Sequence, residues 1–256
     1  MRFRKTLGIG VLLYVTSYLA VSTHVLFDYS QYNAPRIEKE VKEGKQPVQL
    51  EVHKYTLNIN GREKFLTLAG EVHFYNKTEH EIAQKLVKDH NYFADECGAC
   101  NYDMTFGDKI FFKSVSFPSR IANSYYVMAT GRSYETISDI AYKGGHEIMA
   151  LEHEDPLKNM PLKDKIAFIT SSWQDALLAP YTYYFLKEEE PFSAEEFEGI
   201  SFKKSLIDDR DKNMALGIIE ILSREEVDNL LANVGIGHLE GVISELELKV
   251  GLKELK

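Results

Sequence analysis

The chain has 256 residues, of which 44% are hydrophobic and 27% charged, and its formal net charge at pH 7 is −9. This composition is typical of an ordinary globular protein with enough chain for one sizeable core. The acidic balance argues against nucleic acid as a partner, because phosphate binding depends on Lys and Arg side chains.

The first 27 residues have the character of a membrane-targeting segment. Arg2, Arg4 and Lys5 precede an apolar run, residues 7–27, that contains no Asp, Glu, Lys or Arg. A run of this length can cross a bilayer, and the basic flank predicts that the N-terminal end stays inside while the rest is translocated. We favour an uncleaved signal anchor over a signal peptide cleaved near Ala20-Val21-Ser22. We therefore expect a single-pass protein of the cell membrane with its domain outside the cytoplasm, or a secreted protein if the leader is cleaved.

Residues 28–47 are polar, charged and bounded by proline, which predicts a linker or a short helical stalk. Residues 48–256 are then one domain. Its two cysteines, Cys97 and Cys100, form a single C-x-x-C pair. In an exported domain a local disulfide or free thiols are the first expectation, ahead of a redox-active pair or half of a zinc site.

The domain opens with a predicted hairpin, because Asn60-Gly61 separates two apolar-rich runs near residues 49–58 and 64–70. A helix follows, for which Thr78 and Glu81 have the spacing of a capping box. Residues 91–96 are the next candidate strand.

The rest of the chain alternates between candidate helices and strands. Residues 119–131 and 133–145 look helical, and residues 147–152 look like a strand. Residues 162–178 are a predicted helix with Ile166, Ile169, Trp173 and Leu177 on a core-facing stripe. For the aromatic run at 181–185 we expect core or rim packing rather than a pocket lining.

The last third of the chain repeats this alternation. Ser193 and Glu196 form a second capping-box signature, and residues 209–222 carry Met214, Ile218 and Ile221 at helical spacing. A strand near 229–234 and a helix at 242–250 complete the chain. The order predicts an α/β fold with a mixed, largely parallel sheet and flanking helices, preceded by the N-terminal transmembrane or signal segment.

One short motif occurs twice. Gly70-Glu71-Val72-His73 and Gly235-Ile236-Gly237-His238 both have the form G-x-x-H, and each follows a candidate strand and precedes a candidate helix. Ligands of α/β proteins bind at the carboxyl ends of strands, and glycine there permits unusual φ or a close approach. If the two strands are neighbours, His73 and His238 face one cleft. The other histidines lack this context and are expected to be surface or core residues: His24, His53, His80, His90, His146 and His153.

Carboxylates at other strand ends can join the two histidines. Glu96 ends one candidate strand and Glu152 another, while Glu71 lies inside the first motif. Two histidines and one carboxylate are a recognised metal-binding set that activates water. Without a metal, a histidine can act as general base towards water while a carboxylate orients it. The sequence does not decide between these alternatives.

Arg210 lies among Asp208, Asp209 and Asp211 at the start of a predicted helix. It is either a salt-bridged residue of the helix N-terminus or a fixed cation that binds a substrate carboxylate or oxyanion.

The order of these motifs resembles the TraB/GumN group, which is related to the Tiki proteins and more distantly to the erythromycin-esterase and ChaN-like proteins. The matching elements extend over roughly residues 64–250: the first G-x-x-H, Glu96, the pair Leu151-Glu152, Arg210, and G-x-x-H-L-x-G from Gly235 to Gly241. Two departures are Glu71, where TraB-like proteins usually have threonine, and Asp211, where many relatives have asparagine.

The resemblance implies an α/β fold whose two G-x-x-H corners share one active site, and Tiki-like members are membrane-anchored, metal-dependent peptidases that act outside the cell. The residues carried over are His73, Glu96, Arg210 and His238, with Glu152 as a weaker addition. Glu71 is a further possible site residue because it lies inside the first motif, next to His73. A divalent metal ion would be bound by His73, Glu96 and His238.

We therefore rank first an extracytoplasmic, membrane-anchored hydrolase, a metal-dependent peptidase acting on a peptide or other small substrate. Two alternatives stay open. One is a protein that binds a peptide, haem or metal without turnover. The other is a metal-independent, esterase-like hydrolase that uses His73 as general base.

Overall fold

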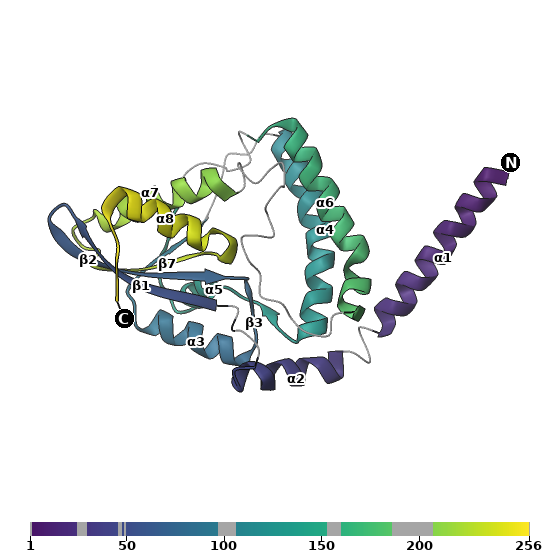
Figure 1. Cartoon of the computed structure of the whole chain (residues 1–256), viewed down its shortest axis with the longest axis horizontal. Helices are drawn as coiled ribbons and strands as arrows, with labels where there is room; N and C mark the ends of the chain where they lie inside the picture. The colour runs from purple at the N-terminus through teal and green to yellow at the C-terminus, as the bar shows by residue number, and fades with distance from the viewer. Residues whose placement is uncertain are drawn as a thin grey trace.

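The computed structural model describes residues 2–24, 30–45, 48, 50–96, 106–152, 160–185 and 207–255 (Figure 1). The predictions made for Cys97, Cys100, His153, Ser193 and Glu196 lie outside these residues.

A six-stranded sheet organises the domain, in the order β6-β4-β7-β2-β1-β8. Its strands are β1 (Leu50–Ile59), β2 (Arg62–Glu71), β4 (Tyr92–Asp95), β6 (Ile148–Ala150), β7 (Asn229–Gly235) and β8 (Lys253–Glu254). Strands β6, β4, β7 and β2 are parallel, whereas β1 is antiparallel to both β2 and β8. The predicted mixed, largely parallel α/β sheet is therefore confirmed.

The predicted hairpin is confirmed as β1 and β2, which pair without interruption from Leu50 opposite Glu71 to Ile59 opposite Arg62. Asn60 and Gly61 connect them with φ of 53° and 77°. Positive φ at both central residues is what a two-residue turn needs to match the twist of its strands, and Asn-Gly adopts it at the least cost.

Helices cover both faces of the sheet (Figure 1). On one face, α7 (Asp209–Leu222) and α8 (Leu239–Val250) bury an apolar core that includes Met214, Ile218 and Val242. On the other face, α3 (Lys77–Lys88) and α5 (Ile137–Lys143) bury a second one around Ala83 and Ile137. The predicted helix 209–222 is confirmed with its apolar stripe inward, and the final helix begins three residues earlier than expected.

Helix α3 begins two residues before the predicted position. Its capping box is formed by Asn76 and Glu79, so the prediction of Thr78 and Glu81 was wrong. Both pairs have the right spacing, but Glu79 also binds the fully buried Arg132 through two hydrogen bonds of 2.9 and 3.0 Å. This tertiary ion pair fixes the register of the helix N-terminus, and no local pattern reveals it.

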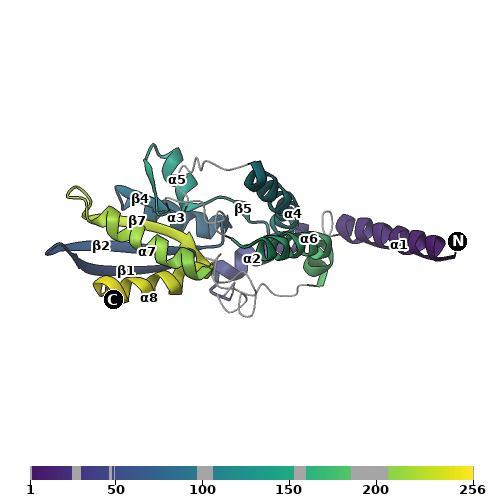
Figure 2. The same cartoon turned by 90° about the horizontal axis from the view of Figure 1, so that it is seen from above.

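A layer of long helices lies beside the sheet domain (Figures 1 and 2). It contains α1 (Arg2–His24), α4 (Phe106–Thr130) and α6 (Leu162–Phe185). The predicted helix at 119–131 is part of α4. The predicted helix at 133–145 is α5 preceded by the short strand β5 (Ser133–Tyr134), which pairs with β3 (Phe74–Tyr75).

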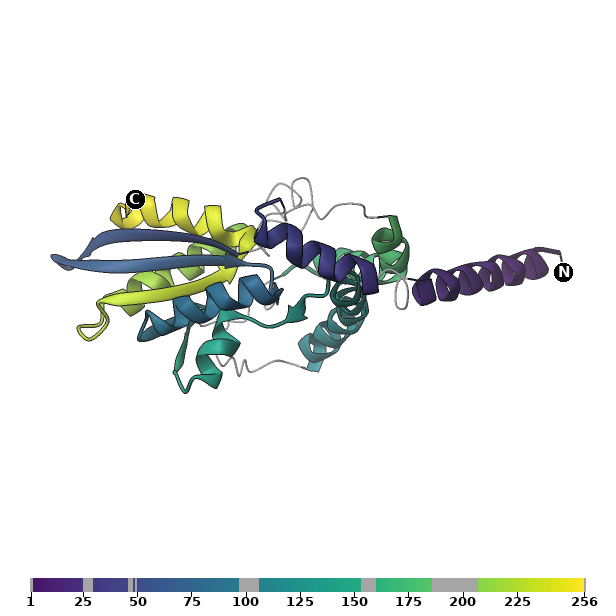
Figure 3. The same ribbon diagram turned by 90° about the horizontal axis from the view of Figure 1, so that it is seen from below.

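The predicted linker at 28–47 contains helix α2 (Ser30–Lys42), which runs between the helical layer and the sheet domain (Figure 3). Ile37 and Val41 are buried, and Glu38 accepts hydrogen bonds from the amide of Lys77 and the hydroxyl of Thr78. This segment therefore packs against the domain as a structured helix.

The prediction of a core-facing stripe on α6 was wrong. Ile166, Trp173 and Leu177 are 56%, 40% and 47% exposed. Tyr181 packs against the rings of Tyr14 and Tyr18 of α1, with ring centroids 6.3 and 6.4 Å apart. The side chains of residues 182–185 lie outside the described part of the structure.

Among the residues that the structure describes, no helix has both the length and the apolar character that crossing a bilayer requires.

Candidate functional site

The carboxyl ends of the four parallel strands meet at one edge of the sheet. Glu71 at the end of β2 lies opposite Gly235 of β7, and Asp95 of β4 lies opposite Asn233 of β7. The backbone continues this alignment past β6, because the amide of Glu152 donates to the carbonyl of Glu96 over 3.1 Å. The two G-x-x-H strands are thus hydrogen-bonded neighbours, and the acidic strand ends flank them.

His73 turns out of the strand in a left-handed backbone conformation, with φ of 64°. Such a φ is uncommon for a residue with a Cβ and occurs mostly where the surrounding structure imposes it. Here the carbonyl of His73 accepts a hydrogen bond from the amide of Glu135, and its Nδ1 lies 3.1 Å from Oε1 of Glu71. The ring is therefore held from both its backbone and its side chain.

Glu71 is fully buried and fixes that ring. Besides His73, its carboxylate accepts hydrogen bonds from the hydroxyl of Tyr75, the side-chain amide of Asn233 and, at 3.1 Å, the backbone amide of Ile137. A carboxylate with so many donors keeps one orientation. It favours the tautomer in which Nδ1–H of His73 donates to it, which leaves a lone pair on Nε2. The structure gives Nε2 no partner among the described residues.

A second network is centred on Arg210, at the start of α7. Its Nε and Nη2 donate to Glu152 over 2.7 to 3.2 Å, and Nη2 also donates to Glu96 over 2.9 Å. Nη1 donates to Nε2 of His238 over 3.2 Å. All three nitrogens of the guanidinium group thus have an acceptor in the protein, so Arg210 holds Glu96, Glu152 and His238 together.

His238 is buried and contacts the guanidinium group of Arg210. It ends the short 3₁₀ turn Ile236–His238 after β7, and its Nδ1 lies 2.6 Å from Oδ1 of Asp211. Because Arg210 can only donate, Nε2 of His238 must accept, and Nδ1–H must donate to Asp211. Both ring nitrogens are therefore used within the protein.

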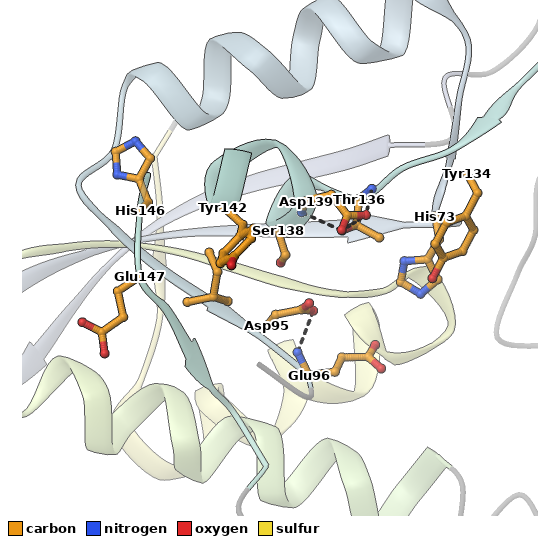
Figure 4. A pocket seen from close by; sticks show the side chains of 11 residues that line it. His73, Asp95, Glu96, Tyr134, Thr136, Ser138, Asp139, Tyr142, His146 and Glu147 are labelled. Carbon is orange, nitrogen blue, oxygen red and sulfur yellow. Dashed lines mark hydrogen bonds between the residues drawn. The ribbon is translucent and has the colours of Figure 1, made fainter. Parts of the chain in front are cut away.

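A cavity of about 560 Å³ opens at this edge of the sheet (Figure 4). Of the residues predicted for the site, His73 and Glu96 line it, together with Asp95. Its other lining residues come from β5, α5 and the segment before and within β6: Tyr134, Thr136, Ser138, Asp139, Tyr142, His146, Glu147 and Ile148. The other residues predicted for the site do not line the cavity: Glu71, Glu152, Arg210 and His238. They hold His73 and Glu96 in position.

The charges of the cavity are coupled. Burial lowers the pKa of His73, but the hydrogen bond and charge of Glu71 and the charges of Glu96 and Asp95 outweigh it and raise that pKa to about 9. Burial raises the pKa of Glu96, but the charge of Arg210 and the hydrogen bond from the amide of Gly235 act in the opposite direction, and the net shift is downward. Burial and the charge of Glu96 raise the pKa of Asp95 to about 6. At neutral pH an ionised Glu96 therefore faces a largely protonated His73.

The predicted metal ligands do not converge in this arrangement. A divalent ion needs lone pairs of His73, Glu96 and His238 directed at one point. Both ring nitrogens of His238 are used by Arg210 and Asp211, so this ring has no lone pair left for a metal ion. Within the described ranges, no group of three or more His, Cys, Asp or Glu side chains has the arrangement of a metal site. The predicted ligand set does not fit a metal here, and the metal stays a prediction from sequence.

The motif glycines serve close packing rather than unusual φ. Gly235 has φ of −60°, and Gly70 is not in the left-handed region either. A Cβ on Gly235 would lie 2.9 Å from Oε1 of Glu96, and one on Gly70 would lie 2.8 Å from the side chain of Leu239. The close approach that the sequence suggested is present, and the positive φ falls on His73 instead.

Sequence reasoning missed several residues of the site. Asp95 and His146 line the cavity, and Asn233 donates to Glu71 and, over 3.5 Å, to Asp95. Asn233 carried a signal, since it is a polar residue inside the apolar strand 229–234. Asp95 also stands beside Glu96 at a strand end. For His146 no local pattern pointed to the cavity, because its position depends on how β6 pairs with β4.

Comparison of the chain with protein-family models, with curated proteins and with solved structures gives no match.

Proposed function

We propose that the chain is a hydrolase in which His73 acts as general base on a water molecule that attacks a carbonyl carbon. The observation that carries this proposal is the pair of His73 and Glu71: a buried carboxylate holds Nδ1–H of the ring, and the opposite nitrogen belongs to a residue that lines an open cavity. A histidine oriented in this way by a carboxylate is the usual arrangement for proton abstraction in acyl transfer.

The steps follow from the positions of the side chains. The attacking water donates one hydrogen bond to Glu96 and one to Nε2 of His73. As its oxygen bonds to the carbonyl carbon, its proton passes to Nε2, and the imidazolium ion is stabilised by Glu71. The same proton then passes to the leaving alkoxide or amine, which completes the hydrolysis of an ester or amide bond. Arg210 acts on this chemistry indirectly, because it orients Glu96 and keeps it ionised.

The cavity favours a neutral or cationic substrate. Asp95, Glu96, Asp139 and Glu147 contribute to its lining, and no Lys or Arg is among the described residues that line it. Tyr134 and Tyr142, which are largely exposed, add aromatic surface at its wall. A peptide or another small ester or amide matches this combination better than an anionic substrate, which the carboxylates would repel.

The location of the activity remains the one that the sequence predicts. A basic flank followed by an apolar segment supports an N-terminal anchor with the domain outside the cytoplasm. A metal-dependent peptidase at the same site is the second candidate, supported by the motif order alone.

The test uses the full chain and a panel of nitrophenyl esters and fluorogenic peptides. Wild-type protein is expected to hydrolyse at least one class, and His73→Ala to reduce kcat/KM about 10²- to 10⁴-fold, the usual contribution of a general base. His53→Ala is the matched control, because His53 lies half-buried on β1 beside Glu51. Full activity in His73→Ala would overturn the proposal. Saturable binding of panel compounds without turnover would favour the binding-protein alternative.

A further inference from the structure

Helix α6 presents a continuous apolar face away from the domain. Leu162, Ile166, Trp173 and Leu177 recur at the spacing of one helical face, and each is at least 40% exposed. Phe117 of α4 extends this face, with its ring centroid 5.9 Å from that of Trp173. An apolar surface of this extent on a soluble protein marks an interaction site.

Helix α1 packs beside α6, and Tyr14 of α1 lines a common groove with Trp173 and Leu177 of α6. Polar side chains join the two helices: Tyr14 donates to the carbonyl of Leu177 over 2.7 Å, and Ser17 lies 2.6 Å from the hydroxyl of Tyr181. The aliphatic side chains of α1, including Leu12 and Leu19, are exposed. Polar contacts between helices with apolar side chains outside are the reverse of packing in water, and they are characteristic of helices surrounded by lipid.

Eight other hydroxyl groups in the described part of this layer form hydrogen bonds inside their own helices. Serines and threonines of α1, α4 and α6 donate to the carbonyl four residues earlier over 2.7 to 2.9 Å: Thr16, Thr23, Ser114, Ser119, Ser124, Thr130, Thr170 and Ser172. Such bonds matter most where no water is available as a partner. The buried small residues Ser172, Ala176 and Ala179 also allow close approach of α6 to its neighbours, as in membrane helix pairs.

Length and charge agree with this environment. Helix α6 has 24 residues, about 36 Å at 1.5 Å per residue, and residues 166–174 contain no Asp, Glu, Lys or Arg. Residues 6–24 of α1 are equally uncharged, and the chain before them carries Arg2, Arg4 and Lys5. Figure 1 shows the N-terminal half of α1 extending beyond the rest of the molecule, where this basic end can reach anionic headgroups.

We propose that the outer face of α1 and α6, formed by Leu12, Leu19, Ile166, Trp173 and Leu177, lies against the hydrocarbon of a lipid bilayer. The protein is then held at the membrane by a helical surface and not by the N-terminal segment alone. This surface is separate from the cavity at His73, so its test does not depend on the proposed reaction.

Trp173 is the only tryptophan of the chain and reports directly on this face. The full chain is mixed with phosphatidylcholine vesicles, with and without phosphatidylserine, and with vesicles whose acyl chains are brominated. The emission of Trp173 is expected to move to shorter wavelength and to be quenched by the brominated chains, with stronger binding when phosphatidylserine is present. Flotation of the protein with vesicles while the emission stays unchanged would overturn the proposal, because α1 alone would then be the anchor.

The double variant Ile166→Asn/Leu177→Asn is expected to weaken vesicle binding about tenfold or more, since it removes two large apolar side chains from the contact. Leu248→Asn is the control, because Leu248 is even more exposed to solvent but lies on α8, over the sheet. Unchanged binding in the double variant contradicts the proposal. So does a blue shift that grows with protein concentration without lipid, which would identify a second copy of the chain as the occupant.

Discussion

His73 depends on Glu71 more than on any other residue. The carboxylate binds Nδ1 of the ring and is itself fixed by Tyr75, Ile137 and Asn233. Against the effect of burial, it contributes most to the rise of the pKa of His73 to about 9, and Glu96 and Asp95 contribute the rest. The neutral ring is the form that accepts a proton, so the rate is expected to rise with pH and to level off above pH 9. Glu71 therefore makes the ring of His73 a stronger base, and it also lowers the fraction of the ring that is neutral at pH 7.

Replacing Glu71 by glutamine separates these two effects. Glu71→Gln removes the negative charge that raises the pKa of His73, so the ascending limb of the pH–rate profile is expected to move to lower pH. Its plateau is expected to fall roughly 10- to 100-fold, since a hydrogen bond to a charged group is worth about 1.5–3 kcal/mol. The measurement is kcat/KM against pH. Glu63→Gln, at an exposed position of the same strand, is the control. If the ascending limb of the pH–rate profile did not move in Glu71→Gln, a group other than His73 would control the rate.

Arg210 is a residue whose removal affects stability as well as rate. Arg210→Met leaves Glu96 and the buried Glu152 without their shared cation, which is expected to cost roughly 3–5 kcal/mol of unfolding free energy. Urea unfolding measures this loss. Lys212→Met, which removes an exposed charge two residues on, is expected to change little. Equal stability of the two variants would mean that the network around Arg210 contributes nothing to folding.

At the scale of elements, the site is assembled by the packing of α7 against the end of β6. Gly217 of α7 lies against the backbone of Leu151, which precedes Glu152. This contact sets the distance over which Arg210 reaches Glu152 and Glu96. The helix can approach so closely only because residue 217 has no side chain.

Gly217→Ala tests that contact. The added Cβ would lie 2.1 Å from the carbonyl oxygen of Leu151, and a backbone atom cannot move aside as a flexible side chain can. We expect a loss of roughly 1–3 kcal/mol in stability, as for other overpacked cores, with a parallel loss of activity. Leu216→Ala, at the exposed neighbouring position, serves as the control in thermal unfolding. If Gly217→Ala matched the wild type in both respects, the packing of α7 would not determine the geometry of the site.

The elements that the sequence predicted well are those specified by local chemistry. Asn60-Gly61 determined the hairpin, and the stripe of Met214, Ile218 and Ile221 determined α7. The wrong predictions depended on distant contacts. Glu79 became the capping partner of α3 because Arg132 binds it, and the stripe of α6 is apolar without facing the core.

At the scale of the whole molecule, the site too was predictable where it depends on local sequence and unpredictable where it depends on distant contacts. The repeated G-x-x-H motif predicted two adjacent strand ends, and β2 and β7 are neighbours. The directions of the rings could not be read from the motif. His73 points to the cavity from a residue with positive φ, whereas His238 ends a 3₁₀ turn and points to Arg210 and Asp211. Two similar motifs therefore have different environments.

The most direct test compares the two histidines. Rates of hydrolysis are measured for His73→Ala and His238→Ala, each with a chelator and with added Zn²⁺. The account predicts that His73→Ala loses about 10²- to 10⁴-fold in kcat/KM. It predicts a clearly smaller loss in His238→Ala, because His238 supports Glu96 only through Arg210, and no effect of either metal treatment on the wild type. Equal losses in the two variants, together with wild-type activity that chelation abolishes and Zn²⁺ restores, would contradict it and would favour the paired-histidine metal site.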